Sequence, residues 1–466
     1  MTGRRARGAV ALLVTALVGA ACSGGSGGAS GGGSAGSSGG CPVDALANAD
    51  QPVTITFWHT QARANLTELE RQIAAFEQSQ DQVRVKLVDQ TGYRELFEKY
   101  KAGLGTGDLP DVAQFEETTV QQLLDSLSTV TIADCVKASR YPLTDFMPRA
   151  IDYYTVDGKL RAMPWTVSNP VLLFDPGKLT AAGLDPSDPP RTFAEIEAAA
   201  RQIVDRGVAK HGIALPARDY FFEFFYAKSG QSYVNHDGGR ASRATAATLD
   251  NPTGKRIWSW WKRMVESGLA LNTGAAEGSF DHLLAIPPGE AAMTIEASGA
   301  IGPINEVLKT GQYPGVTIAA GPLPSLTGRG GVPVGDASLW ISNRSAPAKQ
   351  AAAWKLIQFL DAPEQIAGFA TASGYVPIRT SAAESPQVQT FWAANPAYRV
   401  AYDQLLQPGG PSANGSVIGA YQGVRDSVRD ALVAMLGEGL SPDEAMARAQ
   451  KGADRAIEDY NTRLGT

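Results

Sequence analysis

The stretch Val53–Phe115 reads VTITFWHTQARANLTELERQIAAFEQSQDQVRVKLVDQTGYRELFEKYKAGLGTGDLPDVAQF, and its hydrophobic period changes along its length. Apolar residues stand at every second position over 53–57 and again over 83–87. Such alternation is typical of β-strands with one buried face. A third short strand is expected over 111–115, so the stretch contains three predicted strands.

Two helices are predicted between these strands. Apolar residues recur every three or four positions over 66–76 and over 96–104, which places them on one helical face. Gly105 and Gly107 then favour a helix end. The resulting order is βαβαβ, which indicates a parallel sheet with helices on its faces and right-handed crossovers. The predicted fold class is therefore α/β.

Further helices are marked by their start signals later in the chain. Thr192 with Glu195 and Ser441 with Glu444 have capping-box spacing, and Pro252 follows a potential N-cap residue, Asn251. The helices are expected from Thr192 through Val204, from Pro252 to about Ser267, over 349–360, over 424–436 and from Ser441 onward. No internal repeat and no long polar linker interrupts them after the first 41 residues. We therefore expect a chain that crosses several times between two lobes.

The N-terminus has the features of an export signal. Arg4, Arg5 and Arg7 precede an apolar run over 9–21, which is too short for a membrane span of about 20 residues. Small residues before Cys22 resemble the lipobox of bacterial lipoproteins. We predict a signal peptide over 1–21, lipidation of Cys22 and a flexible Gly/Ser tether over 22–41. The alternative is an ordinary cleaved signal with an incidental cysteine. Either way, the folded part is expected outside the cytoplasm, and lipidation would anchor it to the outer face of the bacterial cell membrane.

Length, charge and cysteine content narrow the class of protein. Of 466 residues, about 425 remain after the first 41, which suits two domains better than one. The first 41 contain three Arg and no acid, so the exported chain has 41 − 3 = 38 basic and 47 acidic residues, a net charge near −9. That balance argues against a nucleic-acid partner and against electrostatic docking on anionic lipid, and leaves a lipid anchor as the expected membrane contact. Outside the cytoplasm Cys41 and Cys135 are expected to form a disulfide, the alternative being two free buried thiols.

Catalytic and cofactor motifs are missing from the sequence. The four histidines, His59, His211, His236 and His282, form no metal-binding motif, and no phosphate loop is present. Glu116 and Glu117 are adjacent, and adjacent residues on a strand face opposite ways, so they are not a ready acid/base pair. We expect no enzyme activity, no metal and no cofactor.

Eight motifs, in order along the exported chain, resemble the extracellular solute-binding proteins of bacterial ABC importers. Within the carbohydrate branch of that family (family 1) they are most similar to the glycerol-3-phosphate-binding proteins. The stretches are ITFWH (55–59), GLGTGDLPD (103–111), PWTVSNPVLLF (164–174), LTAAGL (179–184), TF (192–193), GEAAMTIEAS (289–298), ASLWI (337–341) and SGYVPI (373–378).

The resemblance implies a two-lobe periplasmic-binding-protein-like fold of type II, with hinge strands between the lobes and the ligand in the cleft. Lobe 1 is expected to comprise 42–167 and about 322–362, and lobe 2 about 168–321 and 363–466. Parallel sheets place ligands beyond the carboxyl ends of their strands, which points to His59 and Glu117. His59 could instead only orient its loop.

Ligand contacts carried over from the family fall on six residues. A carboxylate, two tyrosines, two serines and a glycine suit a polyol, because they supply acceptors, donors and ring faces. Each also has a structural alternative: packing at the hinge, turn formation or a solvated loop acid. The six are Tyr93, Glu117, Ser168, Ser298, Gly335 and Tyr375.

Departures from the family pattern add further candidates. Ser416 stands where glycerol-phosphate binders place an arginine, and Arg425 is interpreted as a surface residue. Asp336 stands where many relatives have glycine and makes an anionic ligand less favourable. Tyr220 belongs to an aromatic block that could stack on a sugar or a choline group, or be core. Trp165 is a candidate stacking residue at the crossing segment.

These residues predict a monomeric receptor that captures a polyol phosphate, such as sn-glycerol-3-phosphate or a glycerophosphodiester, and delivers it to ABC permease subunits. The alternative ligand is a neutral mono- or oligosaccharide. Rival interpretations are an extracellular glycoside-processing enzyme, which needs two carboxylates about 5–9.5 Å apart, and a purely structural lipoprotein.

Overall fold

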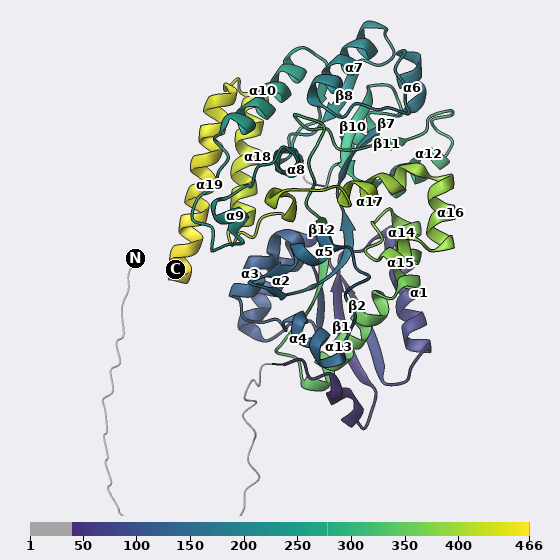
Figure 1. Ribbon diagram of the computed structural model, residues 1–466, viewed down its shortest axis with the longest axis vertical. Coiled ribbons are helices and arrows are strands. Elements are labelled where there is room, and N and C mark those ends of the chain that lie inside the picture. Colours follow the sequence, from purple (N-terminus) through teal and green to yellow (C-terminus); the bar gives the residue numbers. More distant parts are fainter. Residues whose placement is uncertain (1–39, 277, 466) are drawn as a thin grey trace, which may run out of the picture. The chain divides into compact units, whose positions relative to one another are not determined.

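Two five-stranded sheets organise the computed structural model, which describes residues 40–276 and 278–465 (Figure 1). Cys22, the signal peptide over 1–21 and most of the predicted tether lie outside the described residues. The first sheet has the order β2-β1-β3-β12-β6 and the second the order β11-β7-β10-β8-β9. A two-stranded ribbon, β4–β5, is separate from both.

The strands of the first sheet are β1 (Val53–His59), β2 (Val83–Asp89), β3 (Val112–Glu116), β6 (Met163–Ser168) and β12 (Gly335–Ile341). Those of the second are β7 (Pro170–Phe174), β8 (His211–Leu215), β9 (Ala270–Asn272), β10 (Ala291–Ala297) and β11 (Ala319–Gly321), and the ribbon is formed by β4 (Thr155–Val156) and β5 (Lys159–Leu160).

The α-helices are α1 (Arg63–Gln78), α2 (Tyr93–Thr106), α3 (Val120–Asp125), α4 (Ile132–Ser139), α5 (Pro148–Tyr153), α6 (Pro176–Ala181), α7 (Phe193–Asp205), α8 (Asp219–Lys228), α9 (Asn235–Gly239), α10 (Pro252–Glu266), α11 (Asp281–Leu284), α12 (Ile301–Lys309), α13 (Pro347–Leu360), α14 (Pro363–Ser373), α15 (Thr380–Ala383), α16 (Pro386–Ala394), α17 (Val400–Leu405), α18 (Tyr421–Gly437) and α19 (Pro442–Leu464). Short 3₁₀ turns are η1 (Val43–Asn48), η2 (Glu117–Thr119), η3 (Ser298–Ala300), η4 (Pro396–Arg399) and η5 (Pro411–Asn414).

The predicted βαβαβ unit is confirmed as β1-α1-β2-α2-β3. Strand β1 pairs in parallel with both β2 and β3. Helix α2 ends at Gly107, whose φ of 83° lies in the left-handed region that glycine adopts without strain. Ile55, Leu69 and Leu96 of this unit have no exposed surface, whereas Val85 and Leu87 of β2 are partly exposed.

The predicted helix starts are also confirmed. The Thr192 hydroxyl accepts from the Glu195 amide and Glu195 bonds back to the Thr192 amide, so α7 has a full capping box. Helix α19 has the same box at Ser441, and Asn251 caps α10. Because these caps satisfy amides that the helix itself leaves unpaired, they fix where each helix begins.

The chain passes between the sheets at short connections. A single residue, Asn169, separates β6 of the first sheet from β7 of the second. The segment between β11 and β12 makes the return crossing. Helices α18 and α19 pack side by side (yellow in Figure 1), and both also contact α10.

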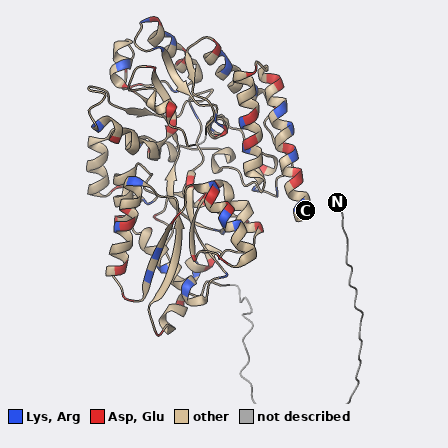
Figure 2. Cartoon of the chain, turned by 180° about the vertical axis from the view of Figure 1, so that it is seen from behind, with Lys and Arg blue, Asp and Glu red and all other residues tan. Residues whose placement is uncertain are grey.

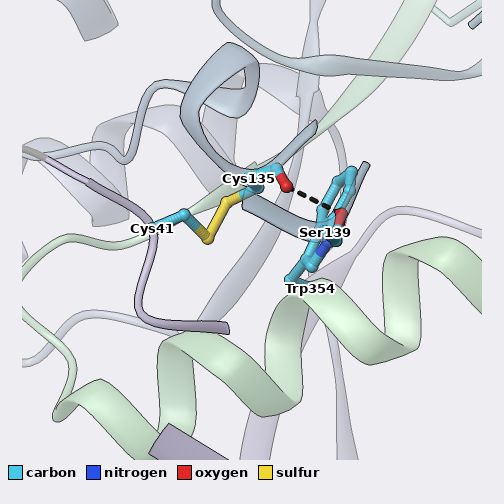
Figure 3. The surroundings of a disulfide bond; sticks show 4 residues. All are labelled: Cys41, Cys135, Ser139 and Trp354. Atoms are coloured by element: carbon cyan, nitrogen blue, oxygen red, sulfur yellow. Dashed lines mark hydrogen bonds between the residues drawn. A yellow bond between two sulfur atoms is a disulfide. The ribbon is translucent and has the colours of Figure 1, made fainter. Parts of the chain in front are cut away.

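Cys41 and Cys135, the pair that the sequence predicts, form a disulfide between the start of the described chain and α4 (Figure 3). One turn further along α4, the Ser139 hydroxyl donates to the Cys135 carbonyl and accepts a 3.1 Å hydrogen bond from the Trp354 indole of α13. Both cysteines are buried. The bond therefore joins the N-terminal segment to the helical layer of the first sheet.

Charges of both signs are interspersed along the helices (Figure 2), and α19 carries acids and bases in alternation. This pattern agrees with a water-exposed helix surface. Within the residues that the structure describes, no helix is both long enough and apolar enough to cross a bilayer.

Candidate ligand-binding site

Polar side chains gather at the carboxyl ends of three strands. Strand β3 ends at Glu116 and is followed by Glu117, β6 ends at Ser168, and β10 is followed by Ser298. Ser168, Glu117 and Ser298 are all buried. These residues lie at the strand ends where the rule for parallel sheets predicts a ligand, so they define the candidate site.

Arg425 of α18 is the centre of a buried ion-pair network, which we call the Arg425 cluster. Its guanidinium lies 2.9 Å from a Glu223 oxygen of α8 and 3.1 Å from a Glu117 oxygen of η2. Glu116 and Asp219 follow at 3.6 Å each. Arg425, Glu117 and Glu223 are at most 6% exposed, so these ion pairs form away from bulk water.

The structure corrects two sequence interpretations here. Arg425 is not a surface residue, since it is 6% exposed and faces acids from distant segments. Glu116 and Glu117 do not face opposite ways, because β3 ends at Glu116 and the 3₁₀ turn η2 begins at Glu117. The alternation of strand side chains therefore stops between them, and both carboxylates reach the same guanidinium.

Asp336 lies at the start of β12 and organises a second polar group. Its carboxylate accepts a hydrogen bond from the Ser168 hydroxyl, across the pairing of β12 with β6. Its φ of 70° is in the left-handed region, which a residue other than glycine seldom occupies. A glycine would adopt that backbone freely, so an aspartate occupies this position at a conformational cost.

Three tyrosines surround Asp336. The Tyr93 hydroxyl accepts a 3.0 Å hydrogen bond from Gln114, and a further bond links Tyr93 to Asp336. Tyr375 lies close enough that Asp336 raises its pKa, after burial. A Cβ on Gly335 would come within 3.0 Å of the Tyr220 hydroxyl, so glycine lets this ring approach the strand.

Burial controls the ionisation of these acids. It raises the pKa of Asp336 to about 7, with hydrogen bonds from Ser168 and Tyr93 acting in the opposite direction. It raises the pKa of Asp219 to about 6, against the effect of Arg425. The pKa of Glu117 is raised well above its usual range by burial and by Glu116. Burial alone would lower the pKa of Arg425, but the negative charges of Glu223 and Glu117 raise it by more, so the guanidinium stays charged.

Asp336→Asn is expected to remove a pH dependence of stability. The pKa of Asp336 is about 7 in the folded chain, against about 3.9 unfolded, so the folded state holds the proton more tightly between these values. Stability should therefore fall as pH rises from about 4 to 7. We expect the variant to match the parent at pH 4 and to exceed it by about 1–3 kcal/mol at pH 8. Urea unfolding at both pH values measures this, and a variant less stable at pH 8 would contradict it.

Four further candidate residues from the sequence analysis have different surroundings in the structure. His59 is the last residue of β1 and is buried. Its ring accepts a 3.2 Å hydrogen bond from the Gln61 amide, which orders the loop after β1. Burial lowers the pKa of His59, so the ring is neutral. Trp165 packs between Phe57 and Phe369 in the core. Ser298 is buried with its hydroxyl unpaired. Ser416 lines a separate small cavity with Tyr233 and Glu223.

Several residues of the site escaped sequence analysis. Glu223 and Asp219 come from α8, and Tyr421 donates to Glu223 from the first turn of α18. One signal could have found Glu223: it is the single charge inside the aromatic block 220–226, YFFEFFY. A charge amid a buried apolar run requires a partner, and Arg425 is that partner.

A second ion pair joins the two sides of the site outside the Arg425 cluster. Asp125 at the end of α3 accepts bonds of 2.6 and 3.0 Å from Arg243, which follows α9. The Tyr460 hydroxyl of α19 donates to the same carboxylate at 2.8 Å. Glu117 and Asp125, both from the segment after β3, thus contact elements on the side of the second sheet.

A family model described as "Bacterial extracellular solute-binding protein" matches residues 71–399, which is most of the chain. The fold and this match define the class: the chain belongs to the bacterial extracellular solute-binding proteins. The predicted family and the two-lobe type II fold are thereby confirmed.

Among curated relatives, the sn-glycerol-3-phosphate-binding periplasmic protein UgpB of Salmonella paratyphi A is 24% identical over 87% of this chain and 93% of its own length. The UgpB structure from Mycobacterium tuberculosis in complex with glycerophosphocholine has a TM-score of 0.73 at 20% identity, covering 88% of this chain and 99% of that one. The sugar-binding protein MalE of Xanthomonas citri has a TM-score of 0.74 at 22% identity, covering 89% and 100%.

Proposed function

We propose that the chain is the extracytoplasmic solute-binding subunit of an ABC importer, lipidated at Cys22 and working as a monomer. It captures a hydroxyl-rich solute between the two sheets and passes it unaltered to the permease subunits. The observation that carries the proposal is the convergence of Glu117, Ser168, Ser298 and Asp336, from both sheets, at the strand ends where such ligands bind. The names of the relatives support transport rather than catalysis.

The leading ligand is a polyol phosphate, and a glycerophosphodiester fits the charges better than sn-glycerol-3-phosphate. Arg425 already faces Glu117 and Glu223 at about 3 Å, so it offers little unmatched charge to a phosphate dianion. A diester has one negative charge fewer. Hydroxyl donors would satisfy the carboxylates, and the serine hydroxyls would contact oxygen.

A neutral mono- or oligosaccharide is the second candidate. The same excess of carboxylates favours it, because sugar hydroxyls donate to carboxylates without adding negative charge. The rings of Tyr93, Tyr220 and Tyr375 would supply the faces on which a sugar packs.

A thermal-shift screen of the processed chain tests this function. The panel contains sn-glycerol-3-phosphate, glycerophosphodiesters and common sugars, each at a concentration well above the expected Kd, where binding adds about 3 kcal/mol of stability. We expect a diester or a sugar to raise the Tm, and Glu117→Gln to diminish that rise. Asp403→Asn, which removes an exposed charge far along the chain on α17, is the matched control and should leave it intact.

The outcomes separate the alternatives. A panel without any stabilising solute would reject solute capture and leave the structural lipoprotein. Mass analysis of the incubated solute gives the other check: a hydrolysed product would show a glycoside-processing enzyme.

A further inference from the structure

Carboxylates outnumber guanidinium groups at the candidate site. Glu116, Glu117, Asp219 and Glu223 lie within 3.6 Å of Arg425. Asp336 is a fifth acid close to them, since Glu116 raises its pKa. Arg429, one turn further along α18, lowers the pKa of Asp219 but pairs with Asp426 and Asp430 at 2.7 and 3.1 Å, so the five acids share mainly the Arg425 guanidinium. Burying charge of one sign without compensation is costly, and the raised pKa values of Glu117, Asp219 and Asp336 reflect this excess of acids. A cation bound among these acids would favour their charged forms.

Several buried polar atoms have no partner at this place, and one of them is the Tyr154 hydroxyl, whose pKa is raised by burial and by Glu117. The second oxygen of Glu117, Oε2, accepts no hydrogen bond although the side chain is 3% exposed. The Ser298 hydroxyl, on the opposite sheet, is fully buried and also unpaired. Buried polar atoms are nearly always satisfied, so each of them indicates a group that the chain itself does not supply.

Aromatic rings adjoin the acids. The Arg425 guanidinium lies 5.7 Å from the centre of the Tyr220 ring, so a cation already rests near that ring. Tyr93 and Tyr375 are influenced by the charge of Asp336. Electron-rich ring faces attract organic cations and add to the effect of the carboxylates. Metal ions fit less well, because no three acid, histidine or cysteine side chains in the described ranges are arranged to hold one.

We propose that the solute carries a protonated amine beside its hydroxyl groups, and that Glu117 and Asp336 receive this ammonium next to the tyrosine rings. The inference rests on the proposed function and specifies the chemical class of its ligand: an ammonium-bearing polyol. An ammonium supplies the donor that Glu117 Oε2 lacks and the positive charge that the five acids lack, whereas a hydroxyl supplies only the donor.

The test compares solutes that carry an ammonium group with similar solutes that lack one. Glycerophosphoethanolamine is paired with glycerophosphoglycerol, and glucosamine with N-acetylglucosamine, each titrated by calorimetry into the processed chain at pH 7. We expect the ammonium member of the pair that binds to have a Kd at least tenfold lower. The same comparison in Asp336→Asn should narrow that ratio to less than about threefold, while the Kd of the member without an ammonium group changes little.

Two further variants serve as a replacement and as a control in this test. Asparagine accepts the left-handed backbone of position 336 better than most residues, and if that variant still fails to fold, Glu117→Gln makes the same prediction at the other acid. Asp403→Asn removes one exposed negative charge and should leave the ratio unchanged.

Failure of this inference is distinguishable from failure of the proposed function. If the member without an ammonium group binds as tightly as its ammonium partner, the inference is overturned and solute capture is left standing. If neither pair binds but another polyol or sugar stabilises the chain, the ammonium class is again rejected. Absence of binding by every hydroxyl-rich solute would overturn both.

Discussion

Replacing Arg425 by Met is expected to lower the free energy of unfolding by about 3–5 kcal/mol at pH 7. The variant keeps an unbranched apolar stem but leaves Glu117 and Glu223 buried without the guanidinium that lies about 3 Å from each. Uncompensated buried carboxylates are far more costly than the loss of an exposed ion pair. Urea unfolding of the parent and the variant measures the difference.

The deficit of Arg425→Met should shrink as the pH falls. Removal of the arginine removes the influence that lowers the pKa of Glu117, so this carboxyl takes up a proton more readily in the variant. Protonation of Glu117 removes part of the unpaired charge, so the free energies of unfolding of parent and variant should approach each other as the pH falls. Arg399→Met is the control, since Arg399 forms an exposed pair with Asp403 and should cost less than about 1 kcal/mol. A loss for Arg425→Met no larger than that control would contradict a buried, charge-paired cluster.

Breaking the disulfide is expected to have an effect of similar size. Cys41 and Cys135 are separated by 94 residues, and a loop of that length corresponds to about 4–5 kcal/mol of unfolded-state entropy. Cys135→Ser should therefore lower the free energy of unfolding by about 2–5 kcal/mol. Denaturant unfolding under oxidising conditions measures this.

Matched variants make the disulfide prediction specific. Cys41→Ser and the double variant should show the same loss as Cys135→Ser, because either substitution alone breaks the bond. A reducing agent should destabilise the parent and leave the variants unchanged. A double variant that loses twice as much as either single one would show that the cysteines stabilise the chain by packing rather than by their bond.

Local sequence patterns were sufficient for much of the fold. The period changes over 53–115 specify β1 to β3 and their helices because each element buries one face against its chain neighbours. Start signals at Thr192, Asn251 and Ser441 place α7, α10 and α19 because a cap acts within four residues. Interactions between residues close in the chain can therefore be recognised from a single sequence.

The ion pairs of the candidate site could not be predicted from the sequence. Arg425 and Glu117 are 308 positions apart, and nothing in the sequence near Arg425 distinguishes a buried guanidinium from one on an exposed helix face. The error at Glu116 and Glu117 has a local cause, since it depends on the residue at which β3 ends. Strand ends are the least certain part of a sequence-based assignment, and here one residue decides whether two carboxylates meet.

The most direct measurement is a crystal structure of the processed chain with a solute that stabilises it. Our account predicts an intact, hydroxyl-rich molecule between the two sheets, in contact with Glu117 and Asp336. A solute bound elsewhere on the surface, or a solute whose bonds have been cleaved, would contradict it.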